Sequence, residues 1–100
     1  MSTMVGTRLS DELIHDIQYV AEEEKSDKSK VIRELLFAAV KQKLKELALE
    51  KYAKQEVSLG KAAELAQLPL ADFMYIAAER KVPLHYSLAS LEKDFKAALR

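Results

Sequence analysis

The chain of 100 residues contains no cysteine and no tryptophan, and it has only two glycines and two prolines. Without cysteine there is no disulfide, no thiolate metal site and no cysteine nucleophile. So few glycines and prolines leave little material for loops. The absence of cysteine also fits a reducing compartment, and we therefore expect a cytoplasmic protein.

Charge of one sign and long apolar runs are also missing. The 16 basic and 16 acidic residues cancel, which counts against a nucleic-acid binder that relies on bulk positive charge. No apolar run approaches the roughly 18 residues of a membrane span, so we expect no membrane partner. The first residues, Met1 to Met4, lack the basic and apolar regions of a signal peptide. A content of 49% hydrophobic and 32% charged residues is typical of a globular helical protein.

The spacing of apolar residues predicts a mainly α-helical chain with one short β-strand. Residues 4–9 alternate loosely and predict the strand. Ser10 is the expected N-cap of a helix over 11–24, whose apolar stripe recurs at helical spacing. Asp27 is a second start signal, and the uninterrupted pattern after it predicts one helix of about 26 residues that ends near Lys54. That helix is long enough to serve as a spacer or a dimer seam.

Shorter elements are expected after this long helix. Ser58 is the predicted N-cap of a helix over 59–66. A proline break follows, and the next helix is expected to start at about Leu70. The chain cannot be helical through Pro83, and a last helix is predicted over 88–99. These patterns predict two domains, 1–56 and 57–100.

A single strand of about six residues cannot satisfy its own backbone groups. In a chain with no second strand, the nearest available partner is the same segment of another molecule. Two copies would form an antiparallel ribbon about a two-fold axis, and such a ribbon fits the major groove of B-DNA.

This order of strand, helix and helix resembles the ribbon-helix-helix repressors of the Arc and MetJ type. The matching residues are Arg8-Leu9-Ser10-Asp11-Glu12-Leu13 and Ser29-Lys30-Val31-Ile32-Arg33-Glu34-Leu35-Leu36. The resemblance covers roughly the first 45 residues. It implies a homodimer that binds double-stranded DNA, with tetramers on DNA left open. The helix predicted after Asp27 is longer than this fold needs.

Candidate base contacts lie in the predicted strand. Arg8 is the strongest, because arginine pairs bidentately with guanine in the major groove. Gly6 shares its face, and there it either permits close approach to DNA or marks a bulge. Met4 can touch a thymine methyl group. Thr7 should point inward, but a bulge that shifts the register would make it the reader instead.

Candidate phosphate contacts lie at the start of the second helix. The backbone N–H groups of Lys28, Ser29 and Lys30 are expected there, and a helix N-terminus attracts phosphate. Asp27, as the cap, competes for these donors. A plain capped helix is therefore the alternative interpretation.

The block over 57–95 resembles a family of small uncharacterised prokaryotic proteins associated with toxin–antitoxin pairs. The residues that carry the resemblance are the run Val57 to Ala66, Phe73, Pro83-Leu84, Tyr86 and Leu91 to Phe95. The resemblance implies an antitoxin whose partner is a ribonuclease of the PIN-domain type. Phe73, Met74, Ile76 and Tyr86 are the candidate partner-binding residues, and a small C-terminal core is the alternative for the first three.

No nucleophile–base pair, phosphate loop or supported carboxylate pair is visible, so we expect no enzyme and no cofactor. His15 and Asp11 are too few ligands for a metal. The sequence therefore favours a DNA-binding transcription regulator, an antitoxin or autorepressor. The alternative is a protein-binding antitoxin or dimeric adaptor whose C-terminal helices neutralise a partner enzyme without binding DNA.

Overall fold

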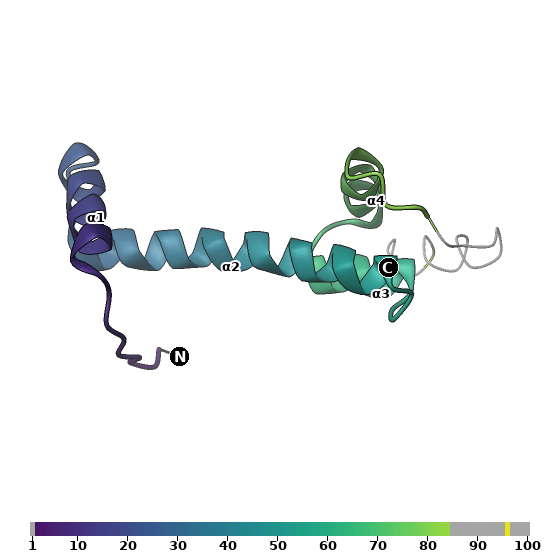
Figure 1. The fold of residues 1–100 in the computed structure, drawn as a ribbon, viewed down its shortest axis with the longest axis horizontal. Coiled ribbons are helices and arrows are strands. Elements are labelled where there is room, and N and C mark those ends of the chain that lie inside the picture. Colours follow the sequence, from purple (N-terminus) through teal and green to yellow (C-terminus); the bar gives the residue numbers. More distant parts are fainter. Residues whose placement is uncertain (1, 85–95, 97–100) are drawn as a thin grey trace. The chain divides into compact units, whose positions relative to one another are not determined.

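The computed structural model describes residues 2–84 and 96, and all regular structure in this part of the chain is helical. The helices are α1 (Asp11–Glu23), α2 (Lys28–Ala53), α3 (Leu59–Ala66) and α4 (Leu70–Glu79) (Figure 1). Their starts confirm the predicted ones, and α2 has the expected 26 residues. The predicted helix over 88–99 and Tyr86 lie outside the described residues, residue 96 excepted.

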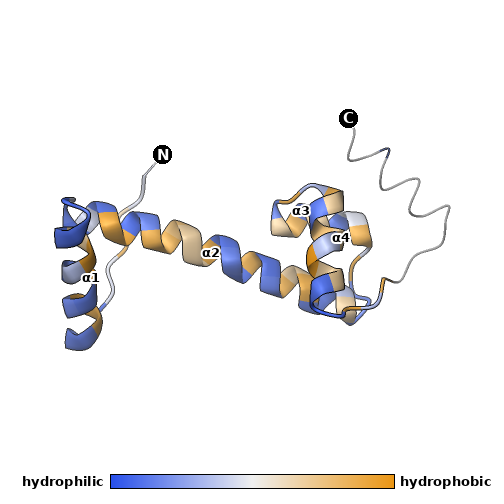
Figure 2. Cartoon of the chain, turned by 90° about the horizontal axis from the view of Figure 1, so that it is seen from above, coloured by the Kyte–Doolittle hydropathy of each residue, from blue (hydrophilic) through white to orange (hydrophobic). Residues whose placement is uncertain are grey.

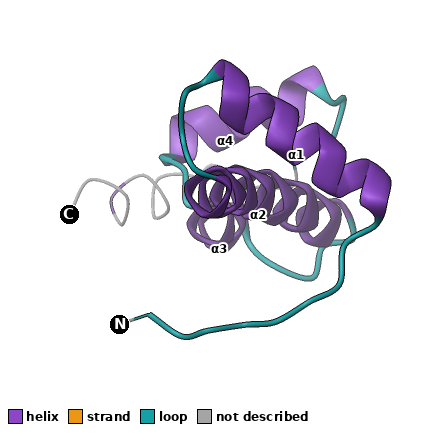
Figure 3. Ribbon diagram, turned by 90° about the vertical axis from the view of Figure 1, so that its left-hand side faces the viewer, coloured by secondary structure: helices purple, strands orange, loops and turns teal. Residues whose placement is uncertain are grey.

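The predicted strand over residues 4–9 is wrong. Residues 2–10 form no regular element, and no strand is present among the described residues (Figure 3). The predicted class of a ribbon-helix-helix fold is therefore corrected to an all-helical one. A loose alternation over six residues is equally compatible with an extended segment whose backbone groups bind water. Such a segment becomes a β-strand only when its backbone forms hydrogen bonds with a second strand.

Side-chain caps fix where three of the helices begin. The Ser10 hydroxyl accepts the Leu13 N–H at 3.1 Å, and the Ser58 hydroxyl accepts the Lys61 N–H at 3.1 Å. At α2 the Asp27 carboxylate accepts the Lys30 N–H at 2.7 Å. Each bond satisfies a donor that the first turn of a helix cannot pair internally. Helix α4 instead starts behind Pro69, which makes no such side-chain bond.

The helix ends share one backbone conformation that the sequence does not predict. Each described helix is followed closely by a non-glycine residue in the left-handed region, namely Lys25 (φ 52°), Gln55 (φ 60°), Gln67 (φ 58°) and Lys81 (φ 58°). The next N–H donates back into the last turn, from Ser26 to Ala21 (2.9 Å), Glu56 to Lys51 (2.9 Å), Leu68 to Ala63 (3.0 Å) and Val82 to Ala77 (2.8 Å). These are Schellman-type ends, which normally favour glycine.

The chain divides into two compact units, Met1–Ala38 and Ala39–Arg100, and the division falls within α2. The core of the first unit consists of Ile17, Ala21 and Val31, with Leu9, Val20 and Ile32 partly buried against it. The core of the second unit is larger and consists of Ala48, Leu49, Tyr52, Leu59, Ala62, Ala63, Ala66, Leu70, Phe73 and Ala77. At its centre the rings of Tyr52 and Phe73 meet edge to face, with centroids 6.0 Å apart at 82°.

None of the described helices combines the length and the apolar character that a membrane crossing requires.

Candidate interaction surfaces

The N-terminal segment carries the candidate base-contacting residues on an exposed backbone. Met4 is 98% exposed, and Gly6, Thr7 and Arg8 are exposed as well. A Cβ built on Gly6 would meet nothing within 4 Å, and no described glycine has positive φ. This glycine is therefore not required by the conformation of the segment. The four candidate base-contacting residues lie on one irregular segment. They do not share the face of a β-sheet.

The start of α2 holds the candidate phosphate-contacting residues. Lys28, Ser29 and Lys30 are all exposed. The Asp27 cap accepts the N–H of Lys30, and the Lys30 ammonium lies 4.0 Å from the Glu34 carboxylate. The capped-helix alternative is therefore present in the structure, and two carboxylates offset part of the positive charge at this helix start.

Four exposed apolar side chains of α1 and α2 lie in the first unit, and we call this group the unit 1 apolar surface. Its members are Leu13 (45% exposed), Leu35 (47%), Leu36 (59%) and Phe37 (68%). The hydropathy colouring shows apolar positions on α2 beside α1 and onward along the helix (Figure 2). Successive helical residues point in directions about 100° apart, so the run Leu35-Leu36-Phe37 presents apolar side chains around most of the helix. A helix that is apolar all round is normally buried.

The candidate partner-binding residues of α4 do not share one exposed groove. Phe73 is fully buried, and Met74 and Ile76 are partly buried against the same core. The residue that faces solvent is Tyr75, at 68% exposure. Helical spacing agrees with the core alternative, because Leu70, Phe73 and Ala77 recur at three and four residues and so define the buried face. Tyr86, the fourth candidate, lies outside the described residues.

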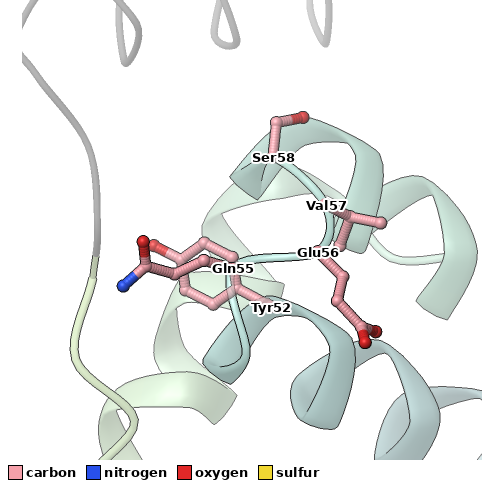
Figure 4. Close-up of a pocket in the computed structure, with 5 residues that line it drawn as sticks. All are labelled: Tyr52, Gln55, Glu56, Val57 and Ser58. Carbon is pink, nitrogen blue, oxygen red and sulfur yellow. The ribbon is translucent and has the colours of Figure 1, made fainter.

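A shallow pocket of about 320 Å³ opens at the turn between α2 and α3 (Figure 4). It is lined by Tyr52, Gln55, Glu56, Val57 and Ser58. The Ser58 hydroxyl caps α3, and the Glu56 carboxylate lies 3.8 Å from the Lys51 ammonium. The lining contains no histidine, and its carboxylate, that of Glu56, lies beside the Lys51 ammonium. In the described chain no group of three or more metal-ligating side chains is assembled either.

One ion pair near the end of α2 is tight enough to shift ionisation. The Lys54 ammonium donates to the Glu50 carboxylate at 2.9 Å. This hydrogen bond and the attached charge lower the pKa of Glu50 and raise the pKa of Lys54. Because the pKa of Glu50 is lowered in the folded chain, the ion pair stabilises the fold at pH values above the ordinary carboxyl pKa. This stabilisation is lost as the pH falls through the lowered pKa. Both groups are exposed, so water weakens the effect.

Over the described residues, the fold is that of a small all-helical protein with four helices. Residues 7–100 match the sequence profile of an uncharacterised protein family, UPF0175. The chain belongs to this family.

Two curated relatives carry the same description, UPF0175 protein. The one from Archaeoglobus fulgidus is 50% identical over 48 residues, which are 48% of this chain and 55% of that protein. The one from Aeropyrum pernix is 43% identical over 53 residues, which are 53% of this chain and 60% of that protein. Each match thus spans little more than half the length of the relative. No solved structure matches this chain.

Proposed function

We propose that this chain is a homodimeric regulatory protein of the antitoxin type, whose first unit pairs with a second copy and whose second unit engages a partner enzyme. The observation that carries the proposal is the unit 1 apolar surface. Its four side chains are 45–68% exposed, whereas the core of that unit contains three buried residues.

The energetics favour covering this surface. A unit of this size with so small a core is marginal, and small domains often rely on oligomerisation. Burying a leucine or phenylalanine side chain contributes about 1.5–3 kcal/mol. Side chains such as Leu36 and Phe37 therefore offer a substantial gain if a partner covers them. A two-fold pair is the commonest solution, because one self-complementary patch then serves both copies.

The second unit can serve a different purpose, because it has a larger core of its own. Ten buried residues, including the Tyr52–Phe73 ring contact, hold α3, α4 and the end of α2 together. The resemblance of residues 57–95 to antitoxin-like proteins supports a partner of the PIN-domain ribonuclease type for this unit.

Sedimentation velocity of the full chain tests the pairing. We expect a dimer at micromolar concentration. Replacing Leu36 with lysine (Leu36→Lys) should place a charge in the pair and shift the sedimentation coefficient to that of a monomer. The matched control is Tyr75→Ser, which removes an exposed aromatic from the second unit and should leave the dimer intact. A wild-type chain that sediments as a monomer at these concentrations would refute the proposal.

DNA binding is the second candidate function, and one observation favours it. Arg8 lies on an exposed extended segment, and Lys28 and Lys30 are exposed at the start of a long helix. Such segments can enter a groove while a helix N-terminus contacts phosphate. The acidic residues of α1, with Glu22 and Glu23 in its last turn, oppose it.

A gel-shift titration tests DNA binding. It uses the DNA that lies upstream of the gene for this protein, at two salt concentrations. We expect affinity to fall steeply with salt, because each neutralised phosphate releases a counterion. Arg8→Ala should cost about 1–3 kcal/mol of specific binding. Val5→Ala is the matched control for the segment, since Val5 is 83% exposed and is not among the candidate contacts. A dimer that fails to bind at low salt would exclude DNA binding.

A further inference from the structure

Helix α2 carries an apolar stripe flanked by lysines in the second unit, which we call the α2 basic face. Its members are Val40 (54% exposed), Lys43, Leu44, Leu47 (41% exposed) and Lys51. Their offsets of three, four, seven and eleven residues place them on one side of the helix. The core of the second unit uses other residues of α2, namely Ala48, Leu49 and Tyr52. The described fold of this unit therefore does not require the stripe to be apolar.

Helix α1 carries a pattern of opposite charge, which we call the α1 acidic face. Its members are Glu12, Leu13 (45% exposed), Asp16, Tyr19 (60% exposed) and Glu23. Offsets of one, four, seven and eleven residues place these side chains on one side of α1, and all five are exposed. Residues 11–25 contain six acidic residues and one basic residue, Lys25. The exposed side of α1 is thus acidic, with two apolar side chains among its carboxylates.

The ion pairs that the described chain forms at these two faces are long and exposed. The Asp16 carboxylate lies 3.8 Å from the ring of His15. Lys43 and Lys51 each lie 3.8 Å from a glutamate of their own chain. Exposed pairs of this kind contribute little to stability. The charges of both faces can therefore exchange these partners for others at an interface.

Within the first unit, α1 uses its other side to pack on the start of α2. Ile17 and Ala21 are buried together with Val31, whereas the α1 acidic face stays exposed. The α2 basic face begins at Val40, nine residues beyond Val31 and so about 14 Å further along the helix. Because α1 is already packed on the start of its own α2, the α1 of a second copy is the one that can lie along the α2 basic face.

The net charges of the two units favour the same arrangement. The first unit has 5 basic and 8 acidic residues, which gives −3, and the second has 11 basic and 8 acidic residues, which gives +3. A dimer that placed the first unit only against its own copy would bring two acidic units together. Placing α1 on the basic stretch of the partner's α2 brings opposite charges together instead.

We propose that the α1 acidic face of each copy docks on the α2 basic face of the other, so that the dimer contains this contact twice. Leu13 and Tyr19 then cover the apolar stripe, while the carboxylates of α1 meet the lysines of α2. Leu36 and Phe37 continue the stripe toward the start of α2, so the docked helix also covers part of the unit 1 apolar surface. The inference rests on the proposed function, since it names the elements through which the second copy binds.

The test is zero-length carbodiimide cross-linking of a mixture of isotope-labelled and unlabelled full-length chains, followed by mass spectrometry. The reagent joins a carboxylate to an ammonium group only where the two are in contact. We expect links between differently labelled chains that join carboxylates of α1 to Lys43 or Lys51. The contact between Lys54 and Glu50, at 2.9 Å, is the positive control and should link within one chain.

An exchange of charges tests the same contact in solution. Lys43→Glu combined with Lys51→Glu should weaken the dimer about tenfold in sedimentation velocity. Adding Asp16→Lys and Glu23→Lys should restore it. Lys61→Glu is the matched control, because it reverses an exposed lysine of α3 and should leave the dimer unchanged. Circular dichroism verifies that the helix content of each variant is unchanged.

Three results would overturn the inference while the wild-type chain sediments as a dimer. They are the absence of links between copies, links from the two lysines to Glu92 or Asp94 of the same chain instead, and failure of the added lysines to restore the dimer. A wild-type chain that sediments as a monomer would refute the proposed pairing and this contact together. The two failures are therefore distinguishable.

Discussion

Left-handed residues close each described helix, and all of them are lysine or glutamine. A side chain with a Cβ costs about 1 kcal/mol or more in this region, whereas glycine adopts it freely. The sequence patterns therefore locate the helix starts, where serine and aspartate are specific signals, better than they locate the ends. At α1, where no glycine stands, the predicted helix over 11–24 runs one residue past the observed end at Glu23.

Glycine at one of these positions should stabilise the protein. Gln55 is exposed at φ 60°, so Gln55→Gly should raise the free energy of unfolding by about 1 kcal/mol. Ala53→Gly, on the last residue of the same helix, should lower it by a similar amount because glycine weakens a helix. Chemical denaturation monitored by circular dichroism measures both. A Gln55→Gly variant less stable than the wild type would contradict the assignment of this helix end.

At the scale of elements, helical periodicity predicted the four described helices with small errors at their ends. Ser10, Asp27 and Ser58 all cap as expected. The strand was wrong because a strand is defined by its partner, and alternation within one segment carries no information about a partner. For Phe73, Met74 and Ile76 the sequence leaves a partner-binding site and a small core as alternatives, and the structure places all three in or against the core.

Phe73 and Tyr75 offer a direct comparison of the two faces of α4. Phe73 is fully buried against Tyr52, whereas Tyr75 is 68% exposed. Phe73→Ala should destabilise the fold by about 3–5 kcal/mol. Tyr75→Ala should change it by less than about 0.5 kcal/mol. Thermal or denaturant unfolding of both variants provides the measurement, and equal losses would mean that α4 is oriented differently.

The molecule as a whole consists of two units with unequal cores. Ten buried residues form the core of the second unit, whereas the first has three and leaves Leu13, Leu35, Leu36 and Phe37 exposed. The sequence left a spacer and a dimer seam as alternatives for the second helix, and it assigned the pairing itself to the strand. The apolar surface offers a reason for pairing that needs no strand. The sequence alone could not show which apolar side chains are exposed, because exposure depends on what packs against each of them.

The central claim is that a second copy of the chain covers the unit 1 apolar surface. The most direct measurement is an isotope-filtered NOE experiment on a mixture of labelled and unlabelled chains. We predict contacts between copies at the methyl groups of Leu35 and Leu36 and at the Phe37 ring, and none at Tyr75. Absence of any contact between copies at these side chains, at concentrations where the chain is folded, would contradict the account.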